Sequence, residues 1–243
     1  MKPVRIAMWS GPRNISTAMM RAFENRGDCA VVDEPFYAHY LVETKSDHPG
    51  RDEIIAAGKT DWRKVVAMLT GPTPGGAPVF YQKHMTHHML AHIGRDWFAD
   101  VTHVFLIRDP RDVLASYLKS RPHATAEDIG VPQESALYDE VSRRTGTTPP
   151  VIDADAFLKR PEAHLRALCE ALGIPFTPRM LKWPAGPRAS DGVWAPYWYD
   201  AVLQSTGFEP WRNRERSVAP EHGRLIDECM PHYEALVARR LSV

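Results

Sequence analysis

Residues 10–17 combine short polar side chains with one fixed positive charge, in the order Ser-Gly-Pro-Arg-Asn-Ile-Ser-Thr. An apolar run precedes them at 4–9, and apolar residues at helical spacing follow at 15–23. A strand that turns directly into a helix directs several backbone N–H groups at one place, where the helix dipole attracts anions. An ordinary connection, in which Ser and Thr only cap a helix, is the alternative. The stretch predicts a phosphate-binding loop formed by Gly11, Pro12, Arg13, Asn14, Ile15, Ser16 and Thr17.

A second group of polar residues follows the β-branched and aromatic segment 102–107. Arg108 stands at the expected end of this strand, and Pro110 begins a helix that we expect to run to about Ser120. Ser116 lies about two turns along that helix. Open α/β sheets bind ligands at the carboxyl ends of their strands, and a guanidinium beside a hydroxyl suits a phosphate monoester. A surface cluster of charged pairs is the alternative interpretation.

The elements that must position these residues alternate along the chain. Strands are predicted at 4–9, 29–33, 79–82, 102–107 and 151–154. Helices are predicted at 15–23, 61–69, 83–94, 110–120, 133–144, 161–172 and 220–241, whereas 37–60 looks polar and interrupted, as in a loop. This alternation, without an internal repeat, predicts an α/β fold in which a parallel sheet is flanked by helices, as a single domain over 1–243.

Composition limits the classes of protein to which the chain can belong. The 30 Lys and Arg residues balance 30 Asp and Glu residues, so any anion site must be local and no nucleic-acid partner is expected. Three cysteines, without Cys-x-x-Cys spacing, argue against a disulfide framework and fit a reducing compartment. No apolar run is long enough to span a membrane. We therefore expect a cytoplasmic protein with no membrane partner, and a homodimer is left open.

Taken together, these segments resemble the sulfotransferase family, whose donor is 3′-phosphoadenosine 5′-phosphosulfate (PAPS). In that family a strand-turn-helix loop binds the 5′-phosphosulfate, as residues 10–17 would. An Arg at a strand end and a Ser eight residues later bind the 3′-phosphate, which matches Arg108 and Ser116. Residues 151–176, with Arg160-Pro161 and a Leu-Gly-Ile-Pro-Phe ending, look like the family's later core. The resemblance implies a P-loop NTPase-like sulfotransferase fold and a transferase that moves a sulfuryl group from PAPS to a hydroxyl or amine of a small-molecule acceptor.

One branch of the family is especially similar: bacterial proteins that are also found attached to plant proteins labelled branched-chain aminotransferase-like. In that branch a Trp-Ala-x-x-Trp-Tyr segment precedes Ser-Thr-Gly-Phe, as it does within 194–208. Other roles are open for both parts of this segment: the aromatic residues 194–199 can simply pack in the core, and residues 205–207 can simply form a turn. The resemblance suggests donor contacts from Ser205, Thr206 and Gly207, and acceptor contacts from Phe36, Trp194, Tyr197 and Trp198.

The phosphate loop departs from the family's usual pattern. Family loops carry Lys or Arg and then Ser-Gly-Thr, whereas Arg13 is followed by Asn14, Ile15 and Ser16. The missing glycine restricts the backbone conformations that the loop can adopt.

Sulfuryl transfer requires a base that takes the acceptor's proton and a cation that neutralises charge on the transferring group. It also requires groups that bind the leaving 5′-phosphate in line. Arg13 and the loop N–H groups fit the last role, and Lys83 resembles the family's strand lysine and fits the cation. Glu34 resembles the Glu base of the carbohydrate-sulfating branch, and His84 the His base of the cytosolic small-molecule branch. Glu34 is favoured because its strand is expected to neighbour the strand before the loop. A carboxylate that only caps a loop and a solvated histidine on a helix are the alternatives.

The histidines at 84, 87, 88 and 92 raise the question of a metal. Residues four apart share one face of a helix. No carboxylate accompanies these histidines in the pattern His-Glu-x-x-His, so no metal is expected.

Two other functions compete with the transferase. A catalytically silent nucleotide-binding or regulatory module would need Arg13, Arg108 and Ser116 only, so the additional presence of Glu34, Lys83 and His84 favours an enzyme. A kinase-like enzyme ranks third, because the loop lacks a Lys followed by Ser or Thr and an evident carboxylate for Mg²⁺.

Overall fold

The computed structural model describes residues 2–119, 123–213, 216 and 218–243, and within them the strands form one parallel sheet. The strands are β1 (Val4–Ser10), β2 (Cys29–Asp33), β3 (Val79–Met85), β4 (Thr102–Ile107) and β5 (Val151–Asp153). Their spatial order is β2-β3-β1-β4-β5, and every pairing is parallel. The predicted parallel sheet is therefore confirmed.

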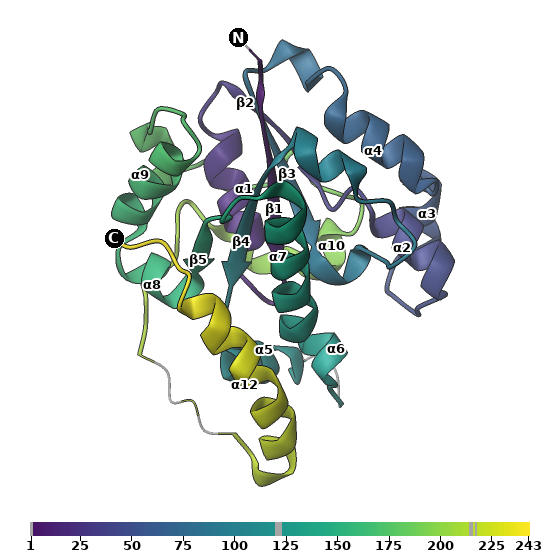
Figure 1. Ribbon diagram of the computed structural model, residues 1–243, viewed down its shortest axis with the longest axis vertical. Helices are drawn as coiled ribbons and strands as arrows, with labels where there is room; N and C mark the ends of the chain where they lie inside the picture. The colour runs from purple at the N-terminus through teal and green to yellow at the C-terminus, as the bar shows by residue number, and fades with distance from the viewer. Residues whose placement is uncertain (1, 120–122, 214–215, 217) are drawn as a thin grey trace.

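Helices cover both faces of the sheet. One face carries α1 (Ser16–Glu24), α8 (Ala154–Lys159) and α9 (Pro161–Ala171), and the other carries α4 (Trp62–Thr70), α7 (Val131–Thr145) and α12 (Gly223–Val237). In Figure 1, α8 and α9 run along one side of the molecule and α4 along the opposite side. The remaining helices are α2 (Tyr37–Thr44), α3 (Arg51–Ala57), α5 (Pro110–Tyr117), α6 (Ala126–Ile129), α10 (Ala195–Trp198) and α11 (Asp200–Gln204). Short 3₁₀ turns lie at η1 (Pro74–Gly76), η2 (Thr86–His88), η3 (Asp96–Asp100), η4 (Pro178–Leu181) and η5 (Pro220–His222). None of the helices in this described part of the chain is long and apolar enough to cross a membrane.

The central strand β1 shows why the sequence folds in this way. Ile6 and Met8 point to the face that carries α1, whereas Ala7 and Trp9 point to the face that carries α7, and all four are fully buried. Strands that are buried on both faces need a continuous apolar run, which is what residues 6–9 provide.

The helix predicted at 83–94 is wrong, because β3 continues through Lys83 to Met85 and no α-helix forms in the rest of that range. Lys83 pairs with Met8 on one side and with Asp33 on the other, so two neighbouring strands hold it in extended conformation. Only the short turn η2 follows. Pairing with distant strands here overrides the local helical spacing.

Two other expectations also need correction. The strand before Glu34 does not neighbour β1, because β3 lies between β1 and β2. Residues 37–60 are not a loop, since they form α2 and α3. The apolar face of α2, including Tyr37 and Leu41, packs against Trp194 and Tyr199, which are distant in the sequence. The predicted end of α5 near Ser120 lies outside the described residues.

Gly130 connects the fold to the phosphate loop and gives a test of this packing. It ends α6 with a φ of 80°, and a Cβ there would lie 3.1 Å from Pro12 Cδ. Gly146 ends α7 with a φ of 66° and has nothing within 4 Å of such a Cβ.

We expect Gly146→Ala to lower the free energy of unfolding by about 1 kcal/mol, the usual cost of left-handed conformation for a residue with a Cβ. Gly130→Ala should cost more, because Pro12 must also move. Urea unfolding of both variants measures the difference, and equal losses would show that the Pro12 contact is unimportant.

Candidate active site

A cavity of about 870 Å³ opens at the carboxyl ends of the central strands. The phosphate loop contributes Pro12, Arg13, Asn14, Ser16 and Thr17 to its wall, and the ends of β2 and β3 contribute Glu34, Lys83, Met85 and Thr86. The far wall is largely aromatic, with Tyr37, Tyr40, His87, His88, Trp198 and Tyr199. The fold thus brings the predicted anion loop and two predicted catalytic residues to one cavity, at the edge where parallel sheets bind ligands.

The phosphate loop bends at Arg13, which has a φ of 55°. This left-handed conformation is one that glycine adopts freely, and here an arginine adopts it. Asn14 fixes the next residue, because its amide donates to the Leu106 carbonyl at 2.6 Å and its oxygen accepts from the Ile15 N–H at 2.8 Å. Ile15 precedes α1 and makes no side-chain cap, so it does not compete with an anion for the first N–H groups of the helix.

Arg108 and Ser116 lie beside this loop, although they come from β4 and α5. Arg108 donates to the Arg13 carbonyl at 2.7 Å, and Arg13 Nε donates to Ser116 Oγ at 3.0 Å. Arg108 also borders a second cavity, of about 270 Å³, together with Lys159, Trp211 and Arg212. Sequence reasoning missed these last three residues. The cationic and aromatic run at 211–216 was the signal that could have found Trp211 and Arg212, whereas Lys159 lies apart from it at the end of α8.

Lys83 is the centre of a buried polar network. Its ammonium donates to Asp33 at 2.9 Å, to Glu34 at 2.5 Å and to the Tyr199 hydroxyl at 3.0 Å. Tyr199 in turn donates to the second oxygen of Asp33 at 2.5 Å. Burial alone would lower the pKa of Lys83, but Asp33, Glu34 and Tyr199 outweigh it and raise that pKa well above its usual value. Lys83 is therefore a fixed cation in the wall of the cavity.

Glu34 is held in an unusual position next to this cation. Its φ is 38°, and its N–H donates to the Lys83 carbonyl at 2.9 Å. Burial raises the pKa of its carboxyl, and Asp33 adds to this effect while Lys83 opposes it. A carboxylate whose pKa is raised toward neutrality accepts a proton more readily than an ordinary one.

His84 lies on the opposite face of β3 from Lys83, because successive side chains of a strand alternate. It is 1% exposed, stacks on Trp9 at 4.4 Å between ring centroids and hydrogen-bonds to Gln82. Burial lowers its pKa to about 3. His84 is not among the described residues that line either cavity. It is a buried strand residue, and not the solvated helix residue considered as the alternative.

The predicted acceptor residues separate into two groups. Trp198 lines the cavity, and Trp194 lies behind it, donating to the Tyr199 hydroxyl at 3.2 Å. Phe36 is buried in the core with Trp97, and Tyr197 lies at the surface with 41% of its area exposed. Neither of these two belongs to the described lining of the cavity.

The predicted donor residues Ser205, Thr206 and Gly207 form a turn that holds the preceding segment. Ser205 Oγ accepts from Trp183 Nε1 at 3.0 Å, and the Thr206 carbonyl accepts from the Trp183 N–H at 3.1 Å. Gly207 forms an isolated antiparallel bridge with Lys182. None of the three is among the described residues that line the two cavities.

Two buried residues near the loop were not singled out by the sequence for this site. His88 is 3% exposed, stacks on Tyr37 and places Nδ1 at 4.0 Å from Glu34. Within the described residues this Nδ1 atom has no hydrogen-bond partner. Glu134 is 1% exposed and accepts from the Gly11 N–H, and burial raises its pKa well above the usual range. Glu134 thus orients the loop, and its raised pKa favours the protonated form, which does not repel an anion.

A family model described as "Sulfotransferase domain" matches residues 4–240. The chain is 37% identical over 232 residues to "Branched-chain-amino-acid aminotransferase-like protein 2" of Arabidopsis thaliana. The match covers 95% of this chain and 41% of the plant protein, so the chain spans about two fifths of that relative's length.

Two solved structures share the fold at low sequence identity. The sulfotransferase domain of the Synechococcus PCC 7002 olefin synthase superposes with a TM-score of 0.62 at 15% identity, over 100% of this chain and 98% of that one. The mouse sulfotransferase SULT7A1, solved in complex with PAP, gives a TM-score of 0.52 at 12% identity, over 96% of this chain and 85% of that one. The sulfotransferase fold expected from the sequence is therefore confirmed.

The raised pKa of Glu134 gives a prediction about pH. In the unfolded chain this carboxyl ionises near its ordinary pKa, whereas in the folded protein it stays protonated to higher pH. Raising the pH through this window therefore weakens the fold. Compared with wild type, Glu134→Gln should gain relative stability as the pH rises, by at most about 1.4 kcal/mol per pH unit.

Glu140 on the same helix is the control, because Arg144 and Arg95 outweigh burial and lower its pKa. Glu140→Gln should show the opposite trend, losing relative stability as the pH rises. Urea unfolding between acidic and mildly alkaline pH measures both variants. A constant gap between wild type and Glu134→Gln would mean that Glu134 is ionised in the folded protein.

Proposed function

The chain belongs to the sulfotransferase family, and we propose that it transfers a sulfuryl group from PAPS to a hydroxyl or amine of a small-molecule acceptor. One observation carries the proposal: the anion loop, the cation Lys83 and the carboxylate Glu34 line the same cavity. Transfer requires these three functions within reach of one reacting group.

The residues present fit the phosphate groups of such a donor. The loop before α1 offers backbone N–H groups, the positive end of the helix and the Arg13 guanidinium. Burial of Glu134, which holds the loop at Gly11, raises its pKa and so favours the protonated form, which does not oppose a negative ligand. We assign the 5′-phosphosulfate end to Arg13, Ser16 and Thr17.

We assign the 3′-phosphate to Arg108 and Ser116, beside the loop. Arg108 stands between the two cavities, since it contacts Arg13 and borders the smaller cavity with Lys159 and Arg212. These cations suit a phosphate, and they share the wall with Asp112, Asp155 and Glu209. Lys159 Nζ lies 4.5 Å from the centroid of the Trp211 ring, which leaves the other face of the ring for a base. The mouse relative was solved with PAP, the product that such a donor leaves.

Within this proposal the donor supplies an activated sulfuryl group, whose bond to the 5′-phosphate is replaced by a bond to the acceptor. Glu34 accepts the proton that leaves the acceptor's hydroxyl or amine. Lys83 neutralises negative charge on the transferring group, and Arg13 with the loop N–H groups holds the leaving phosphate. Asp33 and Tyr199 orient Lys83 and compensate its buried charge.

The acceptor would occupy the part of the cavity beyond Glu34. The walls there are Tyr37, Tyr40, His88 and Trp198, which favour a compact, partly apolar or aromatic molecule. A silent nucleotide-binding module would need the loop but would have no use for a buried Lys83 paired with Glu34. That network favours the enzyme.

The donor assignment is tested by titration calorimetry with 3′-phosphoadenosine 5′-phosphate and adenosine 5′-phosphate. We expect Arg108→Ala to weaken binding of the first ligand by about tenfold to a hundredfold, because a charged hydrogen bond is lost. Binding of the second ligand, which lacks the 3′-phosphate, should change little. Equal losses for both ligands would show that Arg108 only holds the loop.

The base assignment is tested with an acceptor found by screening phenols, alcohols and amines against radiolabelled PAPS. We expect Glu34→Gln to lower kcat by at least about a hundredfold while donor affinity stays nearly unchanged. Glu127→Gln, at an exposed position of the same cavity, is the control and should keep its turnover. A loss of turnover in His84→Ala or His88→Ala, with Glu34→Gln active, would refute the assignment.

A further inference from the structure

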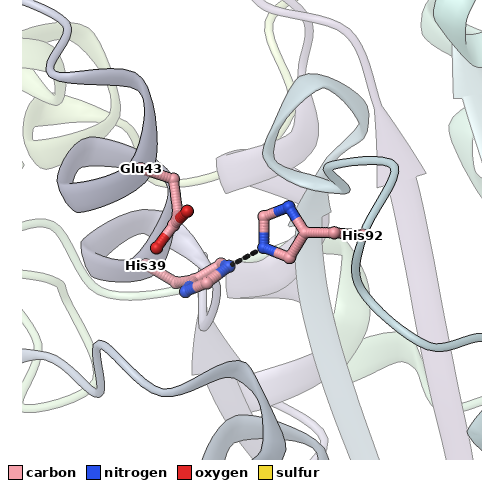
Figure 2. A group of neighbouring side chains, drawn as sticks. All are labelled: His39, Glu43 and His92. Carbon is pink, nitrogen blue, oxygen red and sulfur yellow. Dashed lines mark hydrogen bonds between the residues drawn. The ribbon is translucent and has the colours of Figure 1, made fainter.

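Helix α2 and the segment after β3 carry a cluster of metal-ligating side chains that lies outside the described lining of the cavity and that the transfer reaction does not use. We propose that His39, Glu43 and His92 form a zinc-binding site that fixes α2 to the segment after β3. The ligand atoms of the three residues lie within 4.8 Å of one another. Figure 2 shows the side chains converging, with the two imidazole rings joined by a hydrogen bond.

His39 is already prepared to act as a ligand. It is 3% exposed, and its Nδ1 lies 2.7 Å from the carbonyl oxygen of Thr60. Since a carbonyl only accepts hydrogen bonds, Nδ1 carries the proton and Nε2 is left with a free electron pair. A hydrogen bond from the other ring nitrogen to a carbonyl is the usual way in which proteins orient a metal-binding histidine.

His92 faces this electron pair. Its Nε2 lies 2.9 Å from His39 Nε2, so in the metal-free protein the N–H of His92 donates a hydrogen bond to His39 Nε2. When a metal ion binds, this proton moves to Nδ1 of His92 and both Nε2 atoms become ligands. Two nitrogens on a tetrahedral Zn²⁺ lie about 3.3 Å apart, so the rings need to separate by only about 0.4 Å.

Glu43 supplies the third ligand from the next turn of α2, four residues after His39. It is exposed, as is His92, so an ion can enter from solvent while the buried His39 fixes the site. Two imidazoles and one carboxylate form a donor set that zinc sites use, with a fourth position left for water. Mg²⁺ and Ca²⁺ prefer oxygen ligands and should bind poorly.

The proposed zinc site joins two segments that line the cavity. Helix α2 carries Tyr37 and Tyr40, and the segment that leads to His92 carries His88, all of which line the cavity. An ion at this site would tie these two walls together. This inference rests on the cluster alone and does not depend on the reaction proposed above.

The test uses untagged protein that has been stripped with a chelator. Titration calorimetry with Zn²⁺ alone should give one saturable site per chain, and Mg²⁺ should give none. His92→Ala and Glu43→Gln should each weaken Zn²⁺ binding by at least about tenfold, the effect that loss of even an outer partner typically has.

Zn²⁺ should also raise the Tm of wild type but not that of His92→Ala. Both substitutions are at exposed positions, so folding should persist.

His232→Ala is the matched control. Glu228 and His232 have the same four-residue spacing on α12 and are both exposed, but within the described residues no third ligand accompanies them. Its Zn²⁺ affinity should equal that of wild type. X-ray absorption of the zinc complex should show two imidazoles and one carboxylate. Unsaturable binding, or an unchanged affinity in His92→Ala, would refute the site and leave a histidine pair joined only by a hydrogen bond.

Discussion

The buried ammonium of Lys83 is the interaction on which the site and its surroundings depend. A lone charge at 1% exposure would cost several kcal/mol, so the fold must bring compensating groups to it. Asp33 and Glu34 come from the end of β2, and Tyr199 comes from a segment more than a hundred residues later. The need to satisfy one cation therefore connects the sheet to the segment around α10. That segment in turn supports α2, because Trp194 and Tyr199 pack against it.

Such a network is not the most stable way to fill an interior, since apolar residues of similar volume often stabilise a protein as well or better. Its retention beside an anion loop is consistent with a chemical role. Burial raises the pKa of Glu34, and the charge of Asp33 adds to this effect while Lys83 opposes it, which gives Glu34 the capacity to take up a proton. Of the two carboxylates that contact Lys83, Glu34 is the one that belongs to the described lining of the cavity.

Backbone strain is concentrated at the same place. Arg13 and Glu34 both have positive φ, which costs about 1–2 kcal/mol for residues that carry a Cβ. A hydrogen bond holds the backbone of each residue. The Arg108 guanidinium donates to the Arg13 carbonyl, and the Glu34 N–H donates to the backbone carbonyl of Lys83. Both of these strained residues line the cavity. Strain that the surrounding structure maintains is typical of functional sites.

The sequence alone determined the features that depend on local spacing. Apolar runs and turn residues predicted the sheet, the loop at 10–17 and the strand end at Arg108, because strands, turns and helix starts leave a pattern within a few residues. The family resemblance added the roles of Glu34 and Lys83, which are still proposals.

Only the tertiary structure decided what depends on contacts between distant segments. It extended β3 through Lys83, because β1 and β2 pair with it there. Since successive side chains of a strand point to opposite faces, the side chain of His84 then points into the core. It made α2 a helix by supplying Trp194 and Tyr199 as partners, and it brought His39 and Glu43 to His92. No local pattern encodes these contacts, since their energy comes from burial and pairing that exist only after the chain has folded.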